Sequence, residues 1–508
     1  QSFNMFLPIA VATAAAIVGA LWVASLHARR RRHALKLPPG PPSFPIIGNL
    51  HTLGSHPHAA LRSLARTYGP VMTLWQGFVP AIVISSPEAA EAVYKTHDAA
   101  FSGRPKNQVA GYFTYGYKGI VFAEYGQHWR YVRKLATSKL LSPSKIATYS
   151  GVRREEMDSF VGRLREDAAA RRTVNLSQRV PELIESITCR MIIGRNAEDS
   201  SELNKVIQES LFLTGVFNIG DGLPILQPFD LQGILRRVKA VTAKFERIMD
   251  GIFAEHTRGE RKGKETDFVD EMLSLENQPG GSGDGGPRQR MDRTTVKAVV
   301  KDLISGGVDT TVTAAEWVIA EIIRHPRVAG ELRKELSSVV GMERQVEEAD
   351  LPRLPYLEMV IKEGLRLHPA GALSVPRECL EDVTLNGYRI PRGSKVVVNI
   401  WAMGRDPRVW SDNAEEFVPE RFKGENVDVL GQDYRILPFG SGRRVCPGAR
   451  MGFLSLRLIV AYLFHSFDME LPGGEAVEKL DMSELPGGGL ATTRARPLRV
   501  LPTYRLNK

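Results

Sequence analysis

A long helical segment that is unusually rich in apolar residues is the sequence feature that most limits how this chain can fold. From Asp292 to Arg324 the spacing predicts one continuous helix, about 50 Å long at the usual rise per residue. Its apolar residues include Val296, Val299, Val300, Leu303, Ile304, Val308, Val312, Ala315, Val318, Ile319 and Ile322. A segment this apolar crosses a protein interior rather than covering its surface. We therefore expect a large helical core around it, with the helix ending at His325-Pro326.

The remaining pattern predicts a mainly α fold with a small β region. Strands are expected at 71–75, 81–84, 383–385 and 395–398, each near a Gly or Pro turn. Helical spacing covers most of 127–270, 328–340 and 355–367, and another helix is expected from Pro447. The Gly-rich stretch 276–293 is interpreted as a surface loop between two helices of one domain.

Composition excludes several classes of protein. With 43% hydrophobic and 24% charged residues in 508, the chain is globular rather than disordered or fibrous. Its three cysteines, Cys189, Cys379 and Cys446, are far apart, which argues against a disulfide-stapled secreted protein and against a cysteine-rich zinc module. The histidines show no HExxH or paired ligand spacing, so none is assigned to a metal.

The N-terminal region predicts a membrane anchor. Phe6 to Leu26 is uncharged and long enough to span a bilayer core, and Arg29 to Arg32 follow it directly. A cleaved secretory signal carries its positive charges before the apolar run, so we expect a retained anchor with the rest of the chain in the cytosol. The expected divisions are a transmembrane anchor at 1–28, a basic stop and Pro-rich hinge at 29–45, and a soluble domain at 46–508.

The net charge of +10 does not indicate nucleic-acid binding. Five of the positive charges and no acid lie in residues 1–36, so the soluble domain is only mildly basic. A basic stop beside an anionic lipid leaflet accounts for the charge of residues 1–36. The sequence begins at Gln1 rather than Met, which leaves open whether residues precede it.

A glycine-rich loop around Cys446 carries the strongest chemical signal. Gly440 and Gly442 permit close backbone approach to a flat group, and Cys446 precedes the expected helix at Pro447. Because a helix N-terminus favours an anion, Cys446 can be held as a thiolate, which suits an axial ligand of haem iron. The alternative is a buried structural cysteine in a loop–helix turn.

Four motifs make the chain resemble the cytochromes P-450. The loop matches FxxGxRxCxG at Phe439, Gly442, Arg444, Cys446 and Gly448. Three further segments agree in order and spacing: Glu363-Gly364-Leu365-Arg366 (ExxR), Pro419-Glu420-Arg421-Phe422 (PERF) and Gly306-Gly307-Val308-Asp309-Thr310-Thr311 (oxygen activation). The resemblance covers residues 38 to about 505 and is closest to plant A-type members, through FSGRP, LPFGSGRRVCPG and NIWAMGRDP.

The resemblance implies the cytochrome P-450 fold, with the long helix over haem b and the Cys446 loop beneath. Glu363 and Arg366, three apart on one helix, would form a buried structural triad with Arg421 rather than a weak surface pair. Asp309 and Thr310 would deliver protons to iron-bound dioxygen. Thr310 can also bond back to a preceding carbonyl and bend the helix, and capping that kink is its alternative role.

The resemblance also implies positions for the cofactor and the substrate. Trp129, Arg133, Arg377 and Arg444 would hold the haem propionates, and Phe439 would lie in the haem-binding loop. The substrate-facing segments contain small or apolar residues, which favour a hydrophobic substrate. The candidate pocket residues are Val121, Phe122, Phe212, Gly306, Ala370, Leu373 and Leu490. The Gly-rich stretch 485–489, directly before Leu490, departs from the family pattern.

Electrons must come from another protein, because no GxGxxG follows a strand in this chain. The resemblance implies NADPH–cytochrome P-450 reductase as the donor, and leaves open the use of cytochrome b5. A basic docking patch for the reductase is expected from Arg130, Lys134, Lys139, Arg443 and Arg450.

We therefore expect a single-pass enzyme of the endoplasmic reticulum membrane that inserts one atom of O₂ into a small lipophilic plant metabolite. Hydroxylation of a phenylpropanoid or flavonoid is favoured, because residues 372–377 resemble that stretch in flavonoid ring hydroxylases. The alternatives are terpenoid or oxime oxidation, a reductase-independent isomerase or dehydratase, a non-catalytic haem carrier or sensor, and a haem-free adaptor.

Overall fold

The structure is a computed structural model. It describes residues 19 and 36–507, apart from 45–46, 78, 196–199, 217, 223, 259–265, 277–290 and 488–489. The anchor expected at 1–28, apart from residue 19, and most of the 276–293 loop lie outside the described residues. Among the helices of the described ranges, none is both long and apolar enough to cross a bilayer.

The described chain is mainly helical, as expected. Its α-helices are α2 (Pro57–Tyr68), α3 (Pro87–Glu91), α4 (Gln108–Phe113), α5 (Gln127–Ala136), α6 (Pro143–Thr148), α7 (Ser150–Ala169), α8 (Leu176–Ile193), α9 (Ser201–Gly215), α10 (Ile219–Gly222), α11 (Ile234–Arg258), α12 (Phe268–Leu273), α13 (Arg293–Arg324), α14 (Pro326–Val340), α15 (Pro355–Leu367), α16 (Ile400–Met403), α17 (Pro407–Trp410) and α18 (Ala449–Ser466).

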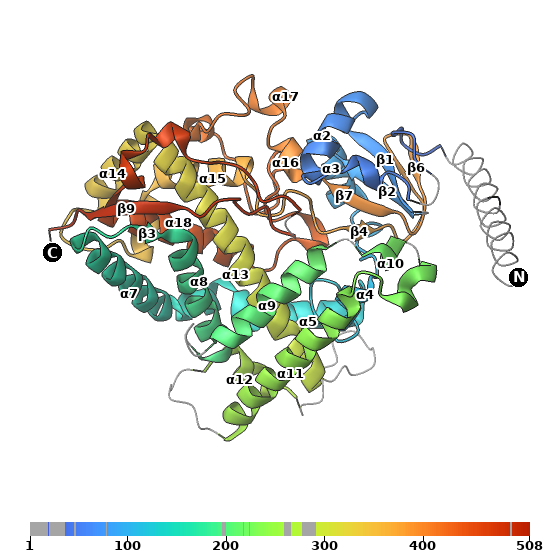
Figure 1. The fold of residues 1–508 in the computed structure, drawn as a ribbon, viewed down its shortest axis with the longest axis horizontal. Coiled ribbons are helices and arrows are strands. Elements are labelled where there is room, and N and C mark those ends of the chain that lie inside the picture. Colours follow the sequence, from blue (N-terminus) through green and yellow to red (C-terminus); the bar gives the residue numbers. More distant parts are fainter. Residues whose placement is uncertain are drawn as a thin grey trace, which may run out of the picture.

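The predicted central helix is α13, which runs through the middle of the molecule with α8, α15 and α18 packed against it (Figure 1). Its start is capped by Asp292, whose carboxylate accepts the Thr295 N–H at 2.7 Å. It ends at His325, before the proline that opens α14. Most of its side chains are buried, which confirms the prediction of a core-crossing helix.

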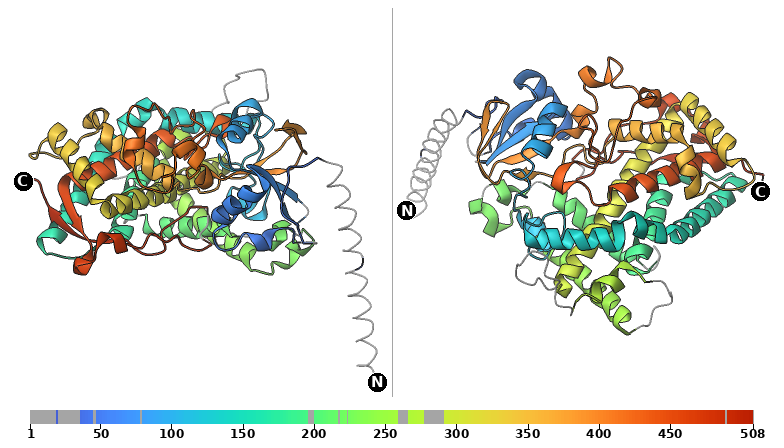
Figure 2. Two further views of the ribbon diagram at one scale, coloured as in Figure 1. Left: turned by 90° about the horizontal axis from the view of Figure 1, so that it is seen from above. Right: turned by 180° about the vertical axis from the view of Figure 1, so that it is seen from behind.

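The strands form small sheets at the edges of the helical body. They are β1 (Val71–Gln76), β2 (Val79–Ile84), β3 (Val174–Asn175), β4 (Arg377–Glu378), β5 (Val383–Leu385), β6 (Tyr388–Ile390), β7 (Lys395–Val398), β8 (Phe467–Glu470) and β9 (Arg499–Tyr504). The largest described sheet has the order β1-β2-β7-β4, with β2 and β7 parallel. It lies with α2 and α3 at the end of the molecule away from the C-terminus (Figure 2).

One predicted boundary is wrong. The helix expected from Pro447 is α18, which begins at Ala449 with Gly448 as its N-cap residue. Cys446, Pro447 and Gly448 instead form a turn, because the Ala449 N–H donates to the Cys446 carbonyl at 3.4 Å. Cys446 therefore lies three residues before the first helical residue rather than directly beside it.

Candidate active site

Two residues in the middle of α13 are exposed although this part of the helix crosses the core. They are Gly306 and Thr310, one turn apart, and a Cβ built on Gly306 would meet nothing within 4 Å. The Thr310 hydroxyl donates to the Gly306 carbonyl at 2.6 Å, which is the back-bond expected from the sequence. Burial raises the pKa of the neighbouring Asp309. This part of α13 thus offers an interior space, a hydroxyl group and an acid whose protonated form is favoured.

The loop before α18 turns tightly and ends at Cys446. Gly440 and Gly442 have φ angles of +67° and +69°, a region that glycine adopts without strain. A Cβ on Gly442 would also overlap the backbone oxygen of Tyr94, so the close packing of this loop requires glycine. The Cys446 N–H donates to the Phe439 carbonyl at 2.9 Å and closes the loop.

The Cys446 thiol lies deep in the protein, yet its side chain has exposed surface, so it borders an interior space. Burial raises the pKa of this thiol, and the Gly448 amide and the Arg133 guanidinium offset that effect only in part. Because α18 begins at Ala449, the backbone group that favours the thiolate is the amide of its N-cap residue Gly448. A bound metal cation would deprotonate such a thiol directly.

Guanidinium groups gather beside this loop. Arg133 donates to the Val445 carbonyl at 2.6 Å, and Arg377 donates to Asp98 at 3.0 Å and to the Ser441 carbonyl at 2.7 Å. Arg444 donates to backbone carbonyls through Nε and Nη2, but its buried Nη1 has no hydrogen-bond partner among the described residues. Burial, together with repulsion from Arg377 and Arg133, lowers the pKa of Arg444 to about 9.

A fourth guanidinium in this cluster, Arg104, was not assigned from the sequence. It is 9% exposed, and burial followed by repulsion from Arg444 and Arg377 holds its pKa well below the usual value. Its Nη1 donates to the Val375 and Pro376 carbonyls, both at 2.8 Å. The FSGRP stretch contains Arg104, but only its position in the fold shows that it belongs to the cluster.

Trp129 lies at the same site with its donor already used. Its indole N–H donates to the Ile120 carbonyl at 3.0 Å, rather than facing an open position. The guanidinium carbons of Arg444 and Arg133 lie 4.4 and 5.2 Å from its ring. In this structure Trp129 therefore supports the guanidinium cluster instead of offering a further hydrogen bond.

These residues fit a haem. The clustered guanidinium groups repel one another, and an unpartnered donor on Arg444 remains, so a dianionic edge such as two propionates would satisfy both. Cys446 provides a sulfur bordering an interior space, and Gly306 leaves room along α13 for a large planar group. Phe439 packs against the core beside Gly452 of α18.

The expected structural triad is present and buried. Arg366 donates to both carboxylate oxygens of Glu363 at 2.7 and 2.8 Å, and Arg421 donates to Glu363 at 2.9 Å. Glu363 and Arg366 are 0% and 1% exposed. The remaining donors of Arg366 bind the carbonyls of Gly404, Ala414 and Glu416, so this pair anchors the segment between α16 and the PERF sequence.

The candidate pocket residues differ in position. Val121, Phe122, Gly306 and Ala370 are partly or fully exposed beside buried segments, and Leu490 is 39% exposed. Leu373 packs against a cluster formed by α2, β1 and β2. The structure does not bring Phe212 to the others.

Phe212 lies on the outer face of α9. It shares this face with the exposed Lys205 and Gln208, and its ring lies 5.6 Å from the guanidinium of Arg237. Arg237 pairs with Glu209 at 2.5 Å, which is also outside the core. The neighbouring Leu213 is the buried residue, because a shift of one position turns a helical side chain by about 100°.

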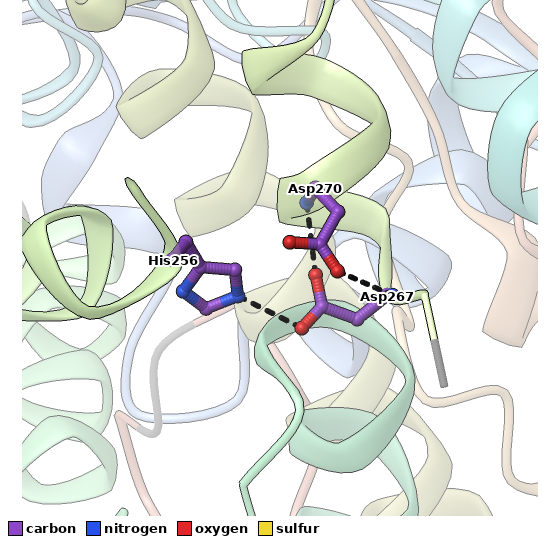
Figure 3. Close-up of side chains that lie close together, drawn as sticks. All are labelled: His256, Asp267 and Asp270. Atoms are coloured by element: carbon purple, nitrogen blue, oxygen red, sulfur yellow. Dashed lines mark hydrogen bonds and ion pairs between the residues drawn. The ribbon is translucent and has the colours of Figure 1, made fainter. Parts of the chain in front are cut away.

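A histidine–carboxylate cluster lies away from this site. His256, Asp267 and Asp270 have potential ligand atoms within 4.8 Å of one another (Figure 3). Asp267 and Asp270 exchange side-chain and backbone hydrogen bonds at the start of α12, which is a capping box. His256 contacts Asp267 at 2.8 Å and the Ile252 carbonyl at 2.8 Å. We interpret this cluster as a helix cap.

The sequence model of the family described as "Cytochrome P450" matches residues 38–497. The chain belongs to the cytochrome P450 family. It is a monooxygenase of this family, and the family cofactor is haem with a thiolate ligand.

Related proteins are similar in sequence to almost the whole of this chain. It is 47% identical over 502 residues to cytochrome P450 CYP736A12 of Panax ginseng, covering 98% of this chain and 100% of that protein. It is 39% identical to flavonoid 3'-monooxygenase of Arabidopsis thaliana, covering 99% and 98%, and 38% identical to phenylacetaldehyde oxime monooxygenase CYP71AN24 of Prunus mume, covering 99% and 95%. A zebrafish cytochrome P450 structure with progesterone superposes with a TM-score of 0.74 at 25% identity, over 88% of this chain and 99% of that chain.

Proposed function

We propose that this cytochrome P450 hydroxylates a phenylpropanoid or flavonoid, inserting one atom of O₂ into a small lipophilic plant metabolite. The observation that carries this proposal is the similarity, over nearly the full chain, to flavonoid 3'-monooxygenases of Arabidopsis thaliana and Petunia hybrida, at 39% identity each. The small or apolar side chains of Val121, Phe122, Gly306 and Ala370 support it, because such a lining favours a flat hydrophobic molecule.

Cys446 is the proposed iron ligand of haem b, and the guanidinium cluster of Arg104, Arg133, Arg377 and Arg444 would hold its propionates. When bound, the haem supplies the binding and activation of O₂, with electron density pushed from the thiolate. Burial of the protein groups around it excludes bulk water, which strengthens each of these charge interactions.

Thr310 and Asp309 are proposed to move protons on the other side of the site. The Thr310 hydroxyl lies in the interior space and is held by the Gly306 carbonyl at 2.6 Å. The raised pKa of Asp309, caused by burial, favours a carboxyl that can hold a proton for transfer to that hydroxyl.

The proposed setting is the endoplasmic reticulum membrane. Residues 1–28 would anchor the chain, residues 29–45 would form the basic stop and hinge, and residues 46–508 would be the cytosolic domain. Electrons would come from NADPH through cytochrome P450 reductase, with cytochrome b5 as a second candidate partner. The family generally uses such a reductase.

A spectral and product assay tests this function. The full-length protein, reduced and exposed to carbon monoxide, is expected to show the red-shifted Soret band of thiolate-ligated haem. Titration with a flavanone and a flavone should convert the iron from low to high spin. With reductase and NADPH the product should gain one oxygen atom. A folded protein that stays colourless with added haemin contradicts the cofactor assignment.

Oxime oxidation is the second candidate, because the oxime monooxygenase of Prunus mume is similar over the same length. A spin change and product with phenylacetaldoxime, but with no flavonoid, would establish this alternative. The same assay with a terpenoid tests the third substrate class. Turnover without NADPH and reductase would instead indicate an isomerase or dehydratase, although Asp309 and Thr310 are both present here.

A further inference from the structure

The backbone of Ile120 and Val121 is held entirely by side chains from other segments. Both N–H groups donate to one carboxylate oxygen, Oδ2 of Asp302, at 2.5 and 3.0 Å. The Ile120 carbonyl accepts the Trp129 indole N–H at 3.0 Å, and the Val121 carbonyl accepts Nε of Arg104 at 3.0 Å. A loop without regular secondary structure thus has its backbone groups bound as completely as those of a strand.

Asp302 lies on α13, one turn before Gly306, and is 7% exposed. A buried carboxylate requires hydrogen bonds to offset the loss of hydration, and the two loop N–H groups provide them. The adjacent Lys301 turns away, because its Nζ lies 3.7 Å from the Phe113 ring centroid and 4.7 Å from that of Phe245. The charge of Asp302 therefore depends on the loop, and the position of the loop depends on Asp302.

Gly119 makes this contact possible. A Cβ built on Gly119 would overlap Oδ2 of Asp302 and lie 3.4 Å from the Ala298 carbonyl. Any larger residue would push the loop away from α13 or displace the carboxylate. The sequence Gly119-Ile120-Val121 is therefore matched to an acidic residue at 302.

Arg104 extends the arrangement to a second segment. The guanidinium that holds the Val121 carbonyl also donates to the Val375 and Pro376 carbonyls at 2.8 Å each. Loop 119–122 and segment 370–376 are thereby fixed relative to each other and to α13. Both contain residues of the proposed substrate pocket.

We propose that Asp302 is a positioning residue that sets Val121 and Phe122 relative to Gly306, and so determines the affinity and orientation of the substrate. Its carboxylate acts through the loop backbone and does not touch the reacting atoms. The inference rests on the proposed function for its substrate readouts, whereas its effect on the loop is measurable without turnover.

Hydrogen–deuterium exchange of the full-length haem-loaded protein tests the loop contact. In Asp302→Ala, the amides of Ile120 and Val121 should exchange at least about tenfold faster, because their charged acceptor is lost. Asp302→Asn should retain most of the protection, since its amide oxygen can accept both N–H groups. Gly119→Ala should reproduce the Asp302→Ala effect, and the double variant should be no worse than Asp302→Ala alone. Gly151→Ala, on α7 with open space at its Cβ, is the matched glycine control.

Spectral titration with a flavanone gives the second readout. Asp302→Ala should weaken binding about tenfold and change the ratio of hydroxylated positions, while the carbon monoxide band is kept and Asp302→Asn restores the wild-type ratio. If Asp302→Ala does not fold, Gly119→Ala and Asp302→Asn still give opposite expected results. Wild-type exchange in Gly119→Ala, or equal loss of protection in Asp302→Asn and Gly119→Ala, would overturn the proposal. A missing carbon monoxide band in the wild type contradicts the proposed function and leaves the exchange result to decide this inference.

Discussion

Lys301 is a buried lysine with no hydrogen bond or close ion pair within the described parts of the chain, and the adjacent Asp302 offsets the effect of its burial only in part. Lys301 is 0% exposed, and its Nζ faces the rings of Phe113 and Phe245. Burial lowers the pKa of Lys301 to about 7. Aromatic faces favour a cation but do not replace its hydration, so this lysine reduces the stability of the fold at neutral pH.

Replacing Lys301 by Met should stabilise the protein. The unfolded lysine keeps its proton up to about pH 10.5, whereas the folded one releases it above about pH 7. The unfolded state thus binds more protons in this window, and the wild type gains stability as pH rises. Lys301→Met should raise the free energy of unfolding by about 2–4 kcal/mol at pH 7, and the gain should shrink toward pH 10.5.

Denaturant unfolding of the haem-loaded protein between pH 7 and 10 measures this difference. Lys297→Met is the control, because Lys297 lies one turn earlier and pairs with Asp250 at 2.7 Å. That control should show no gain. A Lys301→Met protein less stable than the wild type at pH 7 would show that the aromatic contacts outweigh the lost hydration.

Thr310→Ala should separate electron consumption from product formation. The variant keeps the interior space but loses the hydroxyl held by the Gly306 carbonyl. We expect product per NADPH consumed to fall about tenfold or more, because proton delivery by a positioned group contributes on this scale. Thr310→Ser should restore most of the ratio. Full coupling in Thr310→Ala would contradict proton delivery by this hydroxyl, whereas product formation that needs no NADPH would favour the reductase-independent alternative.

Residue types were easier to predict than hydrogen-bond partners. The resemblance to the cytochromes P-450 predicted that Cys446, Arg133, Arg377 and Arg444 lie at one site, because each belongs to a short segment that the family shares. The Trp129 indole N–H donates to the Ile120 carbonyl. This bond could not be predicted, because contacts with residues distant in sequence set the path of loop 119–122. The outward direction of Phe212 depends on which face of α9 is buried, and a single helix turn of mixed residues does not determine that.

At the level of elements, the link between α15 and the PERF segment depends on one buried carboxylate. Glu363 accepts bonds from Arg366, Arg421 and the Val418 N–H, the last at 2.7 Å. Removing one partner leaves an uncompensated buried charge. Glu363 and Arg366 therefore fix the position of the segment that precedes the Cys446 loop.

Arg366→Met should lower the free energy of unfolding by about 3–5 kcal/mol and release haem more readily, because Glu363 would be left partly unpaired. Thermal unfolding and haem transfer to an acceptor protein measure the two effects. Glu358→Gln, which removes the half-exposed partner of Lys362 on the same helix, should cost under about 1 kcal/mol. Equal losses of unfolding free energy in the two variants would show that burial of the triad does not determine its contribution to stability.

Elements with a strong local signal were predicted, and those that depend on distant pairing were not. α13, α14, α15, β1 and β2 follow from periodicity and from Pro or Gly at their ends. β8 and β9 were not predicted, because they pair with each other across a long stretch of sequence. β4 was also not predicted, because it is a two-residue strand that pairs with β7. The start of α18 was misplaced because a turn and a helix both accept Pro447.

At the level of the whole molecule, the expected basic docking surface is smaller than the sequence indicated. Lys139 pairs with Glu271 at 2.8 Å, and Arg443 pairs with Asp98 at 3.3 Å. Arg130, Lys134 and Arg450 are exposed and make no ion pair among the described residues. Arg130 and Arg443 both lie beside the Tyr125 ring, at 5.7 and 5.8 Å, so the surface near the Cys446 loop keeps a positive character.

Arg130→Glu and Lys134→Glu should slow electron transfer from the reductase several-fold at low salt, because charge complementarity mainly raises the rate of encounter. The difference from the wild type should shrink as ionic strength rises and screening shortens the range of attraction. Arg443→Glu is a poorer test, since Asp98 also holds Arg377 and the change would disturb the guanidinium cluster. Lys244→Glu, an equal charge change at an exposed site on α11, is the control. Stopped-flow kinetics measure the rate of haem reduction. If Arg130→Glu and Lys134→Glu are reduced as fast as Lys244→Glu at every salt concentration, the reductase contact lies elsewhere on the surface.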